Sequence, residues 1–393
     1  MSMQIESIEI GNYRVFRRAE LTDIPRLSVL VGANGSGKST LFDIFSFLKD
    51  ALNQNVAVAV NRRGGFRELV ARGETGPISI VLKFRETGGR LATYELAVGL
   101  DGVRPVVERE VLKFRRGQRG RPWHFVDFSR GQGTAITNEA SYGEDGAEQQ
   151  RKEYRLDEPS ILAIKGLGQF KEFRVVSEFR SLIENWHISD FHIAEARPSV
   201  DHGFAEHLST RGDNVAQVAK FLWDNHRDRF DEILKVMKRR VPGVERVDAQ
   251  PTEDGRLVLR FQDGAFKDPF IARYVSDGTI KMFAYLVLLH DPAPFPLLAI
   301  EEPENQLYPE LLPELAEEFR AYAGRGGQVF VSTHSPDFLN GLRLPEIYWL
   351  TKKDGFSTIQ RASESKLLCD LVAEGDLPGA LWKQGLFGEN LAR

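Results

Sequence analysis

The chain has 393 residues, 42% of them hydrophobic and 27% charged, which is typical of a soluble globular protein of about two to three domains. Its net charge of -4 excludes a chain that wraps wholesale around nucleic acid, so any such contact must come from a local patch. The single cysteine, Cys369, excludes an intramolecular disulfide framework and a cysteine-rich metal site, and it fits a reducing compartment.

The N-terminal residues MSMQIESIEI lack the basic start and apolar run of a signal peptide. No window approaches the roughly 20 apolar residues that a membrane-spanning helix needs. We therefore expect a cytoplasmic protein with no membrane partner.

In chain order, residues 3–31 predict strands that lead into a turn. The continuous apolar run Leu27–Val31 is typical of a strand buried on both faces, as in a parallel sheet covered by helices. A glycine-rich turn follows, and the next apolar residues recur at helical spacing: Leu41, Phe42, Phe45, Leu48 and Leu52. The predicted order is strand, loop, helix.

Residues 78–130 change to a period of two, which predicts antiparallel hairpins, whereas residues 129–153 have little periodicity and predict a mobile loop. Helical spacing returns over residues 213–241 and ends at Pro242–Gly243. An alternating strand, Leu257–Phe261, comes next, and the C-terminus predicts a small helical tail.

The run Gly32-Ala33-Asn34-Gly35-Ser36-Gly37-Lys38-Ser39-Thr40 fits the phosphate-loop pattern G-x-x-x-x-G-K-[ST]. Its glycines let consecutive backbone N–H groups point at phosphate oxygens, and the following helix adds the positive end of its dipole. Lys38 can reach the β- and γ-phosphates of ATP, and the Ser39 hydroxyl can ligate Mg²⁺. The apolar strand before the loop and the amphipathic helix after it outweigh the alternative of a simple capping turn.

Two later strands end in polar residues suited to hydrolysis. LLAIEEPEN delivers Glu301 and Glu302 at a strand's carboxyl end, where α/β folds bind ligands. Glu301 is suited to hold Mg²⁺, and Glu302 is suited to orient or deprotonate the attacking water. QVFVSTHS delivers His334, which can donate to the γ-phosphate or to that water, although a solitary histidine is more often structural.

Upstream, Val275-Ser276-Asp277-Gly278-Thr279 opens an apolar helix. Ser276 and Gly278 at a helix N-terminus can form a second anion cradle. In isolation, a simple capping turn with Ser276 or Asp277 as N-cap is the better explanation of the pattern.

Taken in order, the phosphate loop, the SDGT turn, the IEEPEN strand end and the STHSP strand resemble an ABC-type ATPase head of the RecF, SMC and OLD-like branch. The opening IEIGNYRVFRRAEL also resembles the first strands of that branch. The resemblance covers roughly residues 1–60 and 270–350. It implies an α/β P-loop fold with a mixed central sheet, helices on both faces, an antiparallel β subdomain and a helical insert.

The resemblance assigns roles position by position. Ser276 and Gly278 would be the signature motif, which contacts the γ-phosphate of ATP bound to the other subunit, so hydrolysis would need a homodimer closed around ATP. The remaining positions carried over are those of the phosphate loop and of the catalytic strand ends, together with the N-terminal basic residue near the nucleotide: Asn34, Lys38, Ser39, Glu301, Glu302, His334 and Arg14.

Three positions depart from the family pattern. Asp277 stands where transporter ATPases have a glycine, which would weaken the contact with the other subunit. Glu301 replaces an aspartate, and the longer side chain favours a water-mediated Mg²⁺ contact. No glutamine is assigned to the Q-loop, because the candidates Gln118, Gln132 and Gln169 lie in uncertain context.

The expected domains are an N-terminal ATPase lobe at 1–77, an antiparallel β subdomain at 78–175, a helical insert at 176–244, a C-terminal ATPase lobe at 245–363 and a helical tail at 364–393. The segment between Lys38 and Glu302 is too short for the coiled-coil arms of chromosome-structuring proteins. With this compact insert, the chain resembles the stand-alone ATPases of bacterial defence and repair operons. That resemblance implies a separately encoded effector such as a nuclease.

A basic tract with interleaved aromatic residues lies in the β subdomain: Lys113, Phe114, Arg115, Arg116, Arg119, Arg121 and Trp123. It fits a DNA contact, through phosphates and base stacking, as well as it fits a solvated hairpin tip. Two other functions stay open. One is an ATP-binding scaffold that scarcely turns over, and the other, ranked last, is a transporter-type ATPase docked on membrane subunits.

Overall fold

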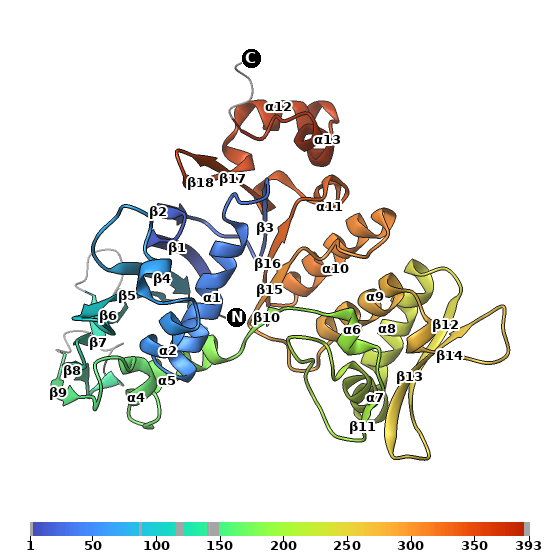
Figure 1. Ribbon diagram of the computed structural model, residues 1–393, viewed down its shortest axis with the longest axis horizontal. Coiled ribbons are helices and arrows are strands. Elements are labelled where there is room, and N and C mark those ends of the chain that lie inside the picture. The colour runs from blue at the N-terminus through green and yellow to red at the C-terminus, as the bar shows by residue number, and fades with distance from the viewer. Residues whose placement is uncertain (1–2, 86–88, 115–121, 140, 142–148, 389–393) are drawn as a thin grey trace. The chain divides into compact units, whose positions relative to one another are not determined.

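The computed structural model describes residues 3–85, 89–114, 122–139, 141 and 149–388. Its elements are labelled in Figure 1. The chain divides into two compact units. The first comprises Met1–Trp186 and Pro345–Lys366, and the second comprises His187–Leu344 and Leu367–Arg393.

An eight-stranded antiparallel sheet dominates the first unit. In spatial order it contains β2 (Phe16–Leu21), β1 (Gln4–Tyr13), β4 (Ile78–Arg85), β5 (Leu91–Asp101), β6 (Arg104–Phe114), β7 (Trp123–Ser129), β8 (Gln132–Ile136) and β9 (Arg151–Arg155). Buried and more exposed side chains alternate along β4 and β5, because one sheet face meets the core and the other meets solvent. The antiparallel hairpins predicted over residues 78–130 are confirmed.

The mobile loop predicted over residues 129–153 is wrong in part, because that range contains β8 and the start of β9. These strands pair from Gln132 with Arg155 to Ile136 with Arg151. Strand β9 is polar and mostly exposed, so backbone hydrogen bonds hold it at the sheet edge without an apolar pattern. Residues 140 and 142–148 of the same range lie outside the described part of the chain.

The first unit also carries a short parallel pair. Strand β3 (Leu27–Gly32) runs parallel to β17 (Ile347–Lys353), which pairs antiparallel with β18 (Phe356–Arg361). All six residues of β3 are buried, as the unbroken apolar run predicted. The helices of this unit are α1 (Lys38–Asn53), α2 (Val56–Asn61), α3 (Phe66–Leu69), α4 (Ala163–Leu167) and α5 (Arg174–Glu184) (Figure 1).

A buried carboxylate ties α4 to the β sheet. Glu110 of β6 accepts hydrogen bonds from the backbone N–H groups of Ala163 and Ile164 and from the Tyr94 hydroxyl. Burial raises the pKa of Glu110 to about 7, although the three hydrogen bonds oppose the rise. Glu110 thereby satisfies two N–H groups that every helix leaves unpaired in its first turn.

In the second unit, strands β15 (Leu297–Glu301) and β16 (Gln328–Thr333) form a parallel pair. A small antiparallel sheet contains β11 (Val200–Asp201), β13 (Arg256–Asp263), β12 (Val244–Pro251) and β14 (Phe270–Ile271). Its helices are α6 (Ile193–Ala196), α7 (Val215–Asn225), α8 (Arg227–Arg240), α9 (Asp277–Leu289), α10 (Leu312–Gly324), α11 (Pro336–Asn340) and α13 (Pro378–Lys383).

Two elements straddle the boundaries between the units: β10 (Trp186–Ser189) and α12 (Lys366–Glu374). Short 3₁₀ turns occur at Ala272–Tyr274, Pro309–Leu311, Leu344–Glu346 and Ala362–Glu364. The helical pattern predicted over residues 213–241 is confirmed as the pair α7 and α8, and the predicted helical tail as α12 and α13. Of the helices in the described ranges, none is both long enough and apolar enough to span a bilayer.

Candidate functional site

The phosphate loop joins β3 to α1 in the first unit, and two of its glycines adopt left-handed backbone angles. Gly35 has φ of 76° and Gly37 has φ of 104°. A Cβ atom on Gly37 would lie 2.9 Å from Val15 Cγ2 and 3.1 Å from Ser357 Oγ. Position 37 therefore needs glycine both for its backbone angle and for space, and the loop is held against the turn after β1.

Lys38 is the first residue of α1 and is only 6% exposed. Its Nζ donates hydrogen bonds to the carbonyl oxygens of Gly32, at 2.7 Å, and Ala33, at 3.3 Å. The ammonium group therefore lies inside the curl of the loop. The first turn of α1 contains no acidic residue, so its N–H groups and dipole stay available to an anion.

The rest of the loop fits a bound phosphate group. Ser36 is buried, and its hydroxyl finds no hydrogen-bond partner among the described residues, so a phosphate oxygen would satisfy it. Asn34 and Ser39 are exposed, and Thr40 is buried. The Ser39 hydroxyl and the Glu301 carboxylate are the hard oxygen donors that Mg²⁺ prefers, and Mg²⁺ typically takes few protein ligands beside substrate phosphates and water.

Arg14 lies against the phosphate-loop helix through an ion-pair network that the sequence did not reveal. Its guanidinium is 3.1 Å from the Asp43 carboxylate of α1. Asp43 also accepts hydrogen bonds from the Tyr13 hydroxyl and from Arg63 Nε, both at 2.7 Å. The pKa of Tyr13 is raised strongly, first by burial and then by the Asp43 charge. This network fixes Arg14 next to α1 one turn beyond Ser39.

In the second unit, Glu301 ends β15 and Glu302 begins the loop after it. The backbone of Glu302 is left-handed, with φ of 45°, and its N–H donates to the carbonyl oxygen of Ser332 at the end of β16. One carboxylate oxygen accepts from Asn305 Nδ2 at 3.0 Å, and the other lies 3.6 Å from His334 Nδ1. The structure thus brings Glu302 and His334 together at the carboxyl ends of neighbouring strands.

Glu304 holds this arrangement in place and was not singled out from the sequence. It is 9% exposed, and its Oε1 accepts from the Thr333 hydroxyl at 2.7 Å and from the backbone N–H of His334 at 2.9 Å. Its Oε2 is buried without a hydrogen-bond partner in the described part of the chain. The third glutamate of IEEPEN, two residues after Glu302, was the signal that could have found it.

The SDGT turn caps α9, and Arg197 binds this turn through hydrogen bonds. Ser276 is the N-cap residue, and its hydroxyl accepts from the Thr279 N–H at 3.3 Å. Arg197 donates to the carbonyl oxygens of Arg273, at 2.8 Å, and Val275, at 2.9 Å, and also pairs with Asp277. The charge of Asp277, the departure from the transporter pattern, is therefore neutralised within the same unit.

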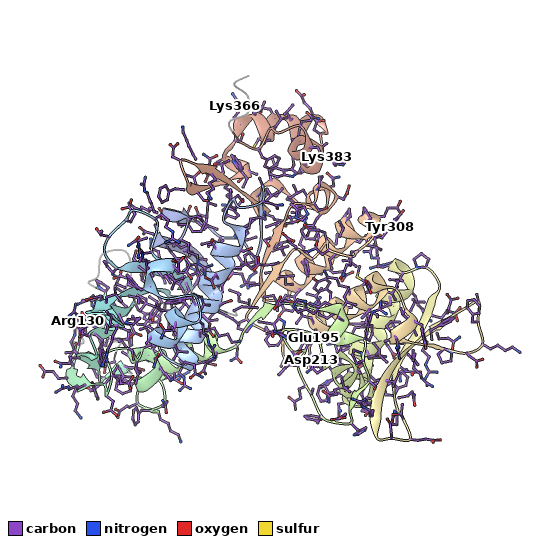
Figure 2. All side chains as sticks on the ribbon, in the orientation of Figure 1. Arg130, Glu195, Asp213, Tyr308, Lys366 and Lys383 are labelled. Atoms are coloured by element: carbon purple, nitrogen blue, oxygen red, sulfur yellow. The ribbon has the colours of Figure 1, made fainter. Side chains whose placement is uncertain are left out.

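The capped turn stays at the surface of its unit. Ser276 is exposed, and Tyr274 just before it is 73% exposed. A second exposed aromatic residue, Tyr308, follows the IEEPEN loop and is 61% exposed (Figure 2). Large aromatic side chains at a surface are typical of a protein interface.

Lys281 connects the SDGT helix to the loop that carries Glu302. It is 5% exposed, and its Nζ donates to the carbonyl oxygen of Asn305 at 2.7 Å. The Asn305 side chain in turn donates to Glu302, as described above. Burial lowers the pKa of Lys281 to about 8, against the opposing charges of Glu304 and Glu302. A continuous hydrogen-bonded chain therefore runs from α9 to the Glu302 carboxylate.

The predicted base-stacking role of the basic tract is wrong for its two aromatic residues. Phe114 and Trp123 are each 2% exposed, face each other across β6 and β7, and pack on Phe125. Lys113 forms an ion pair with Glu95. The arginines at 115, 116, 119 and 121, and Gln118, lie outside the described residues. Of the other Q-loop candidates, Gln132 begins β8 and Gln169 follows α4.

Two solved structures of SMC head domains share this fold. The SMC head bound to the C-winged helix domain of ScpA aligns over 91% of this chain and 96% of its own, with a TM-score of 0.53 and 15% identity. The SMC head with an extended coiled coil, bound to the C-terminal domain of ScpA derived from Pyrococcus furiosus, aligns over 94% of this chain with a TM-score of 0.51 and 13% identity. These likenesses confirm the predicted α/β P-loop fold of ABC-ATPase type.

A curated relative matches over a short stretch. The DNA replication and repair protein RecF of Idiomarina loihiensis is 31% identical over 74 residues, which is 19% of this chain and 19% of that protein. The predicted resemblance to a RecF- and SMC-like ABC-type ATPase is confirmed, and such P-loop families bind nucleotide, typically with Mg²⁺. A family model spans residues 27–340, so the chain belongs to the family described as "AAA domain, putative AbiEii toxin, Type IV TA system".

Proposed function

We propose that the protein hydrolyses ATP to ADP and phosphate at two composite sites, which form when two copies close around ATP. The observation that carries this proposal is the Glu302–His334 pair, which Glu304 and Asn305 hold at the carboxyl ends of β15 and β16. A carboxylate at a strand end, with a hydrogen bond from Asn305 on one oxygen and the His334 ring 3.6 Å from the other, is suited to take a proton from an attacking water.

Each residue then has a defined task. The phosphate loop and Lys38 hold the β- and γ-phosphates, with Arg14 fixed beside the same helix. Ser39 and Glu301 would hold Mg²⁺, which supplies positive charge to the phosphate oxygens. Glu302 accepts a proton as the water oxygen bonds to the γ-phosphorus and the bond to the β–γ bridging oxygen breaks. His334 donates a hydrogen bond to the transferred phosphoryl group or the water.

The partner copy would complete each site. Ser276 and Gly278 at the N-terminus of α9 would contact the γ-phosphate held by the other copy, since a capped helix start presents N–H groups to an anion. The exposure of Ser276 and the partial exposure of Gly278 support this role, because a buried turn could not reach a second molecule.

The biological role that we propose is a cytoplasmic switch for a separately encoded effector, such as a nuclease, in phage defence or DNA repair. The family description names a toxin system, the matched relative is a repair protein, and both SMC head structures contain a domain of another protein, ScpA. An ATP-driven dimer gives such an effector two states to recognise.

Mixing two inactive variants tests the composite site. We expect Lys38→Ala and Ser276→Arg each to be inactive alone, because one lacks its phosphate lysine and the other obstructs the γ-phosphate of its partner. In an equal mixture, half the dimers are mixed and each retains one intact site, so about a quarter of wild-type phosphate release should return. Variants that stay inactive together while forming mixed dimers, or Ser276→Arg activity equal to wild type, would contradict the trans arrangement.

Lys281 should act through the position of Glu302. We expect Lys281→Met to lower kcat by about tenfold or more while the Kd for ATP stays unchanged, because the chain to Asn305 is broken but the phosphate loop is not. The measurement is steady-state phosphate release together with equilibrium ATP binding.

The pH dependence distinguishes this role from a structural one. Lys281 has a pKa of about 8, so it is charged below that pH and neutral above it. The neutral amine loses its attraction to Glu302 and Glu304, so wild-type kcat should fall as pH rises through 8. Lys281→Arg stays charged and should lack this decline. Equal alkaline profiles in wild type and Lys281→Arg would exclude the titration of Lys281 as the cause.

A further inference from the structure

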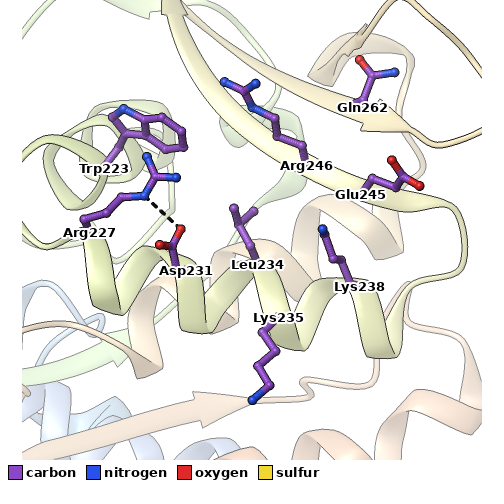
Figure 3. A pocket seen from close by; sticks show the side chains of 9 residues that line it. All are labelled: Trp223, Arg227, Asp231, Leu234, Lys235, Lys238, Glu245, Arg246 and Gln262. Carbon is purple, nitrogen blue, oxygen red and sulfur yellow. Dashed lines mark hydrogen bonds and ion pairs between the residues drawn. The ribbon is translucent and has the colours of Figure 1, made fainter.

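A groove of about 730 Å³ lies in the second unit between α8 and β12, and none of the residues assigned to ATP lines it. Figure 3 shows Trp223, Arg227 and Arg246 gathered toward one end of it and Lys238 toward the other. Its side chains come from α7, α8, β12 and β13, so regular elements hold it rather than loops. A volume of this size accommodates a ligand as large as a nucleotide.

The aromatic end of the groove carries a stacked pair. The Arg227 guanidinium lies 3.5 Å from the centre of the Trp223 ring, and that of Arg246 lies 5.5 Å from it. Trp223 is fixed by an edge-to-face contact with the buried ring of Phe230, at 5.4 Å between centroids. Arg227 is held by a 2.9 Å ion pair with Asp231. The guanidinium plane therefore forms a prepared surface on which another planar group can stack.

The groove has an excess of positive charge in a chain whose net charge is -4. Four cationic side chains line it against two acidic ones: Arg227, Lys235, Lys238 and Arg246 against Asp231 and Glu245. Lys235 and Lys238 have no acidic partner within the described ranges, unlike Arg239 and Arg240 beside them, which pair with glutamates of α10. Arg227 and Arg246 pair with Asp231 and Asp248, so the charges of Lys235 and Lys238 are the ones that no ion pair in the described part of the unit explains.

We propose that this groove binds single-stranded nucleic acid. An unpaired base stacks on the Arg227–Trp223 pair, and Lys238 and Arg246 contact neighbouring phosphates. Stacking on aromatic or guanidinium planes combined with cationic side chains is how proteins hold unpaired strands. In a duplex the base faces are already stacked on one another, and the side chains of an acidic peptide have no aromatic ring to stack on the guanidinium plane. Both ligands therefore fit the observations less well.

Binding of a fluorescein-labelled oligo-dT of about 16 nucleotides, followed by anisotropy at several salt concentrations without ATP, tests the proposal. Trp223→Leu should weaken binding by about tenfold with little change in salt dependence, because it removes stacking and no charge. The double variant Lys238→Glu with Arg246→Glu should weaken binding by more than about tenfold and reduce the slope of log K against log salt by about 1.4.

The control is Lys352→Glu with Lys353→Glu, which makes the same change of charge on exposed residues of β17. It should bind as wild type, and unchanged thermal unfolding should accompany each variant used. If the control and the groove variant lost equal affinity for the oligonucleotide, the loss would reflect the overall charge of the protein, and the proposal would be overturned. Equal affinity for a duplex of the same length, or full competition by polyglutamate at matched charge, would also overturn it.

Ultraviolet crosslinking of the wild-type protein gives a readout that needs no variant. Crosslinks to bromodeoxyuridine in the oligonucleotide should map to the peptides that contain Trp223 or Arg246. Crosslinks confined to the basic tract around Lys113 would place the nucleic acid on the β subdomain and contradict the groove assignment.

Discussion

Replacing Glu302 with glutamine should reduce ATP hydrolysis by about 10² to 10⁴-fold while leaving ATP binding intact. The amide cannot accept the proton of the attacking water, but it matches the carboxylate in size. Its oxygen can still accept the hydrogen bond from Asn305 Nδ2 that positions residue 302. Binding and closure should therefore proceed, and ATP-bound dimers should accumulate because the step that opens them is blocked.

Two measurements check this prediction: single-turnover hydrolysis, and sedimentation or light scattering with Mg²⁺ and ATP. Glu310→Gln is the matched control. Glu310 lies in the short turn before α10, is exposed, and has no contact with Asn305 or His334 among those described for Glu302. Wild-type turnover in Glu302→Gln would remove Glu302 from the catalytic role. If turnover were lost but no ATP-dependent dimers formed, Glu302 would keep its catalytic role, and the proposal that two copies close around ATP would be contradicted.

Replacing Lys38 with alanine should weaken ATP binding by about 10² to 10⁴-fold. The variant would lose the proposed hydrogen bonds from the ammonium group to the β- and γ-phosphates, and two bonds from a charged group contribute about 3–6 kcal/mol together. Lys38 Nζ already lies on the carbonyl groups of Gly32 and Ala33, so binding requires little rearrangement of its side chain. Hydrolysis should fall below detection, because in the proposed mechanism the same ammonium group stabilises the charge that develops on the γ-phosphate.

Equilibrium binding of a fluorescent ATP analogue measures the loss, and phosphate release measures turnover. Lys353→Ala, an exposed lysine on β17, serves as the control and should match wild type in both. If Lys38→Ala bound ATP as tightly as wild type, the cradle formed by the loop backbone would be sufficient. The functional assignment of the lysine would then be restricted to catalysis.

The phosphate loop could be predicted from the sequence because its determinants are local. Glycine spacing sets the left-handed angles at Gly35 and Gly37, and the flanking apolar patterns set the strand before and the helix after. The strand-end positions of Glu301, Glu302 and His334 could be predicted for a related reason: each lies at the end of a strongly apolar run, so the neighbouring residues indicate where the strand ends.

The residues that hold these groups could not be predicted, because their partners are distant in sequence. Arg197 meets Asp277 across 80 positions, and Arg63 meets Asp43 across 20. Lys281 is a polar residue within an otherwise apolar helix, and only the fold places its ammonium group against the Asn305 carbonyl. Charge pairs of this kind have no sequence period, since long flexible side chains can meet from unrelated elements.

The aromatic residues show the same limit from the other direction. Phe114 and Trp123 alternate with basic residues, which suggested a nucleic-acid surface, yet alternation in a strand places successive side chains on opposite faces. The sheet therefore buries both rings, whereas the neighbouring Lys113 is only half-buried. No sequence pattern marks Trp223 as part of a site. It belongs to the candidate groove because α8 and β12 bring Arg227 and Arg246 to its ring.

By itself, the sequence determined the α/β class, the phosphate loop and the strand-end acids, because these depend on local backbone angles and hydrophobic periods. Only the tertiary structure decided which side chains brace Glu302 and His334, that Asp277 is neutralised by Arg197, and where free positive charge collects. The physical reason is that buried polar groups require partners, and packing alone determines which distant residue is close enough to satisfy each of them.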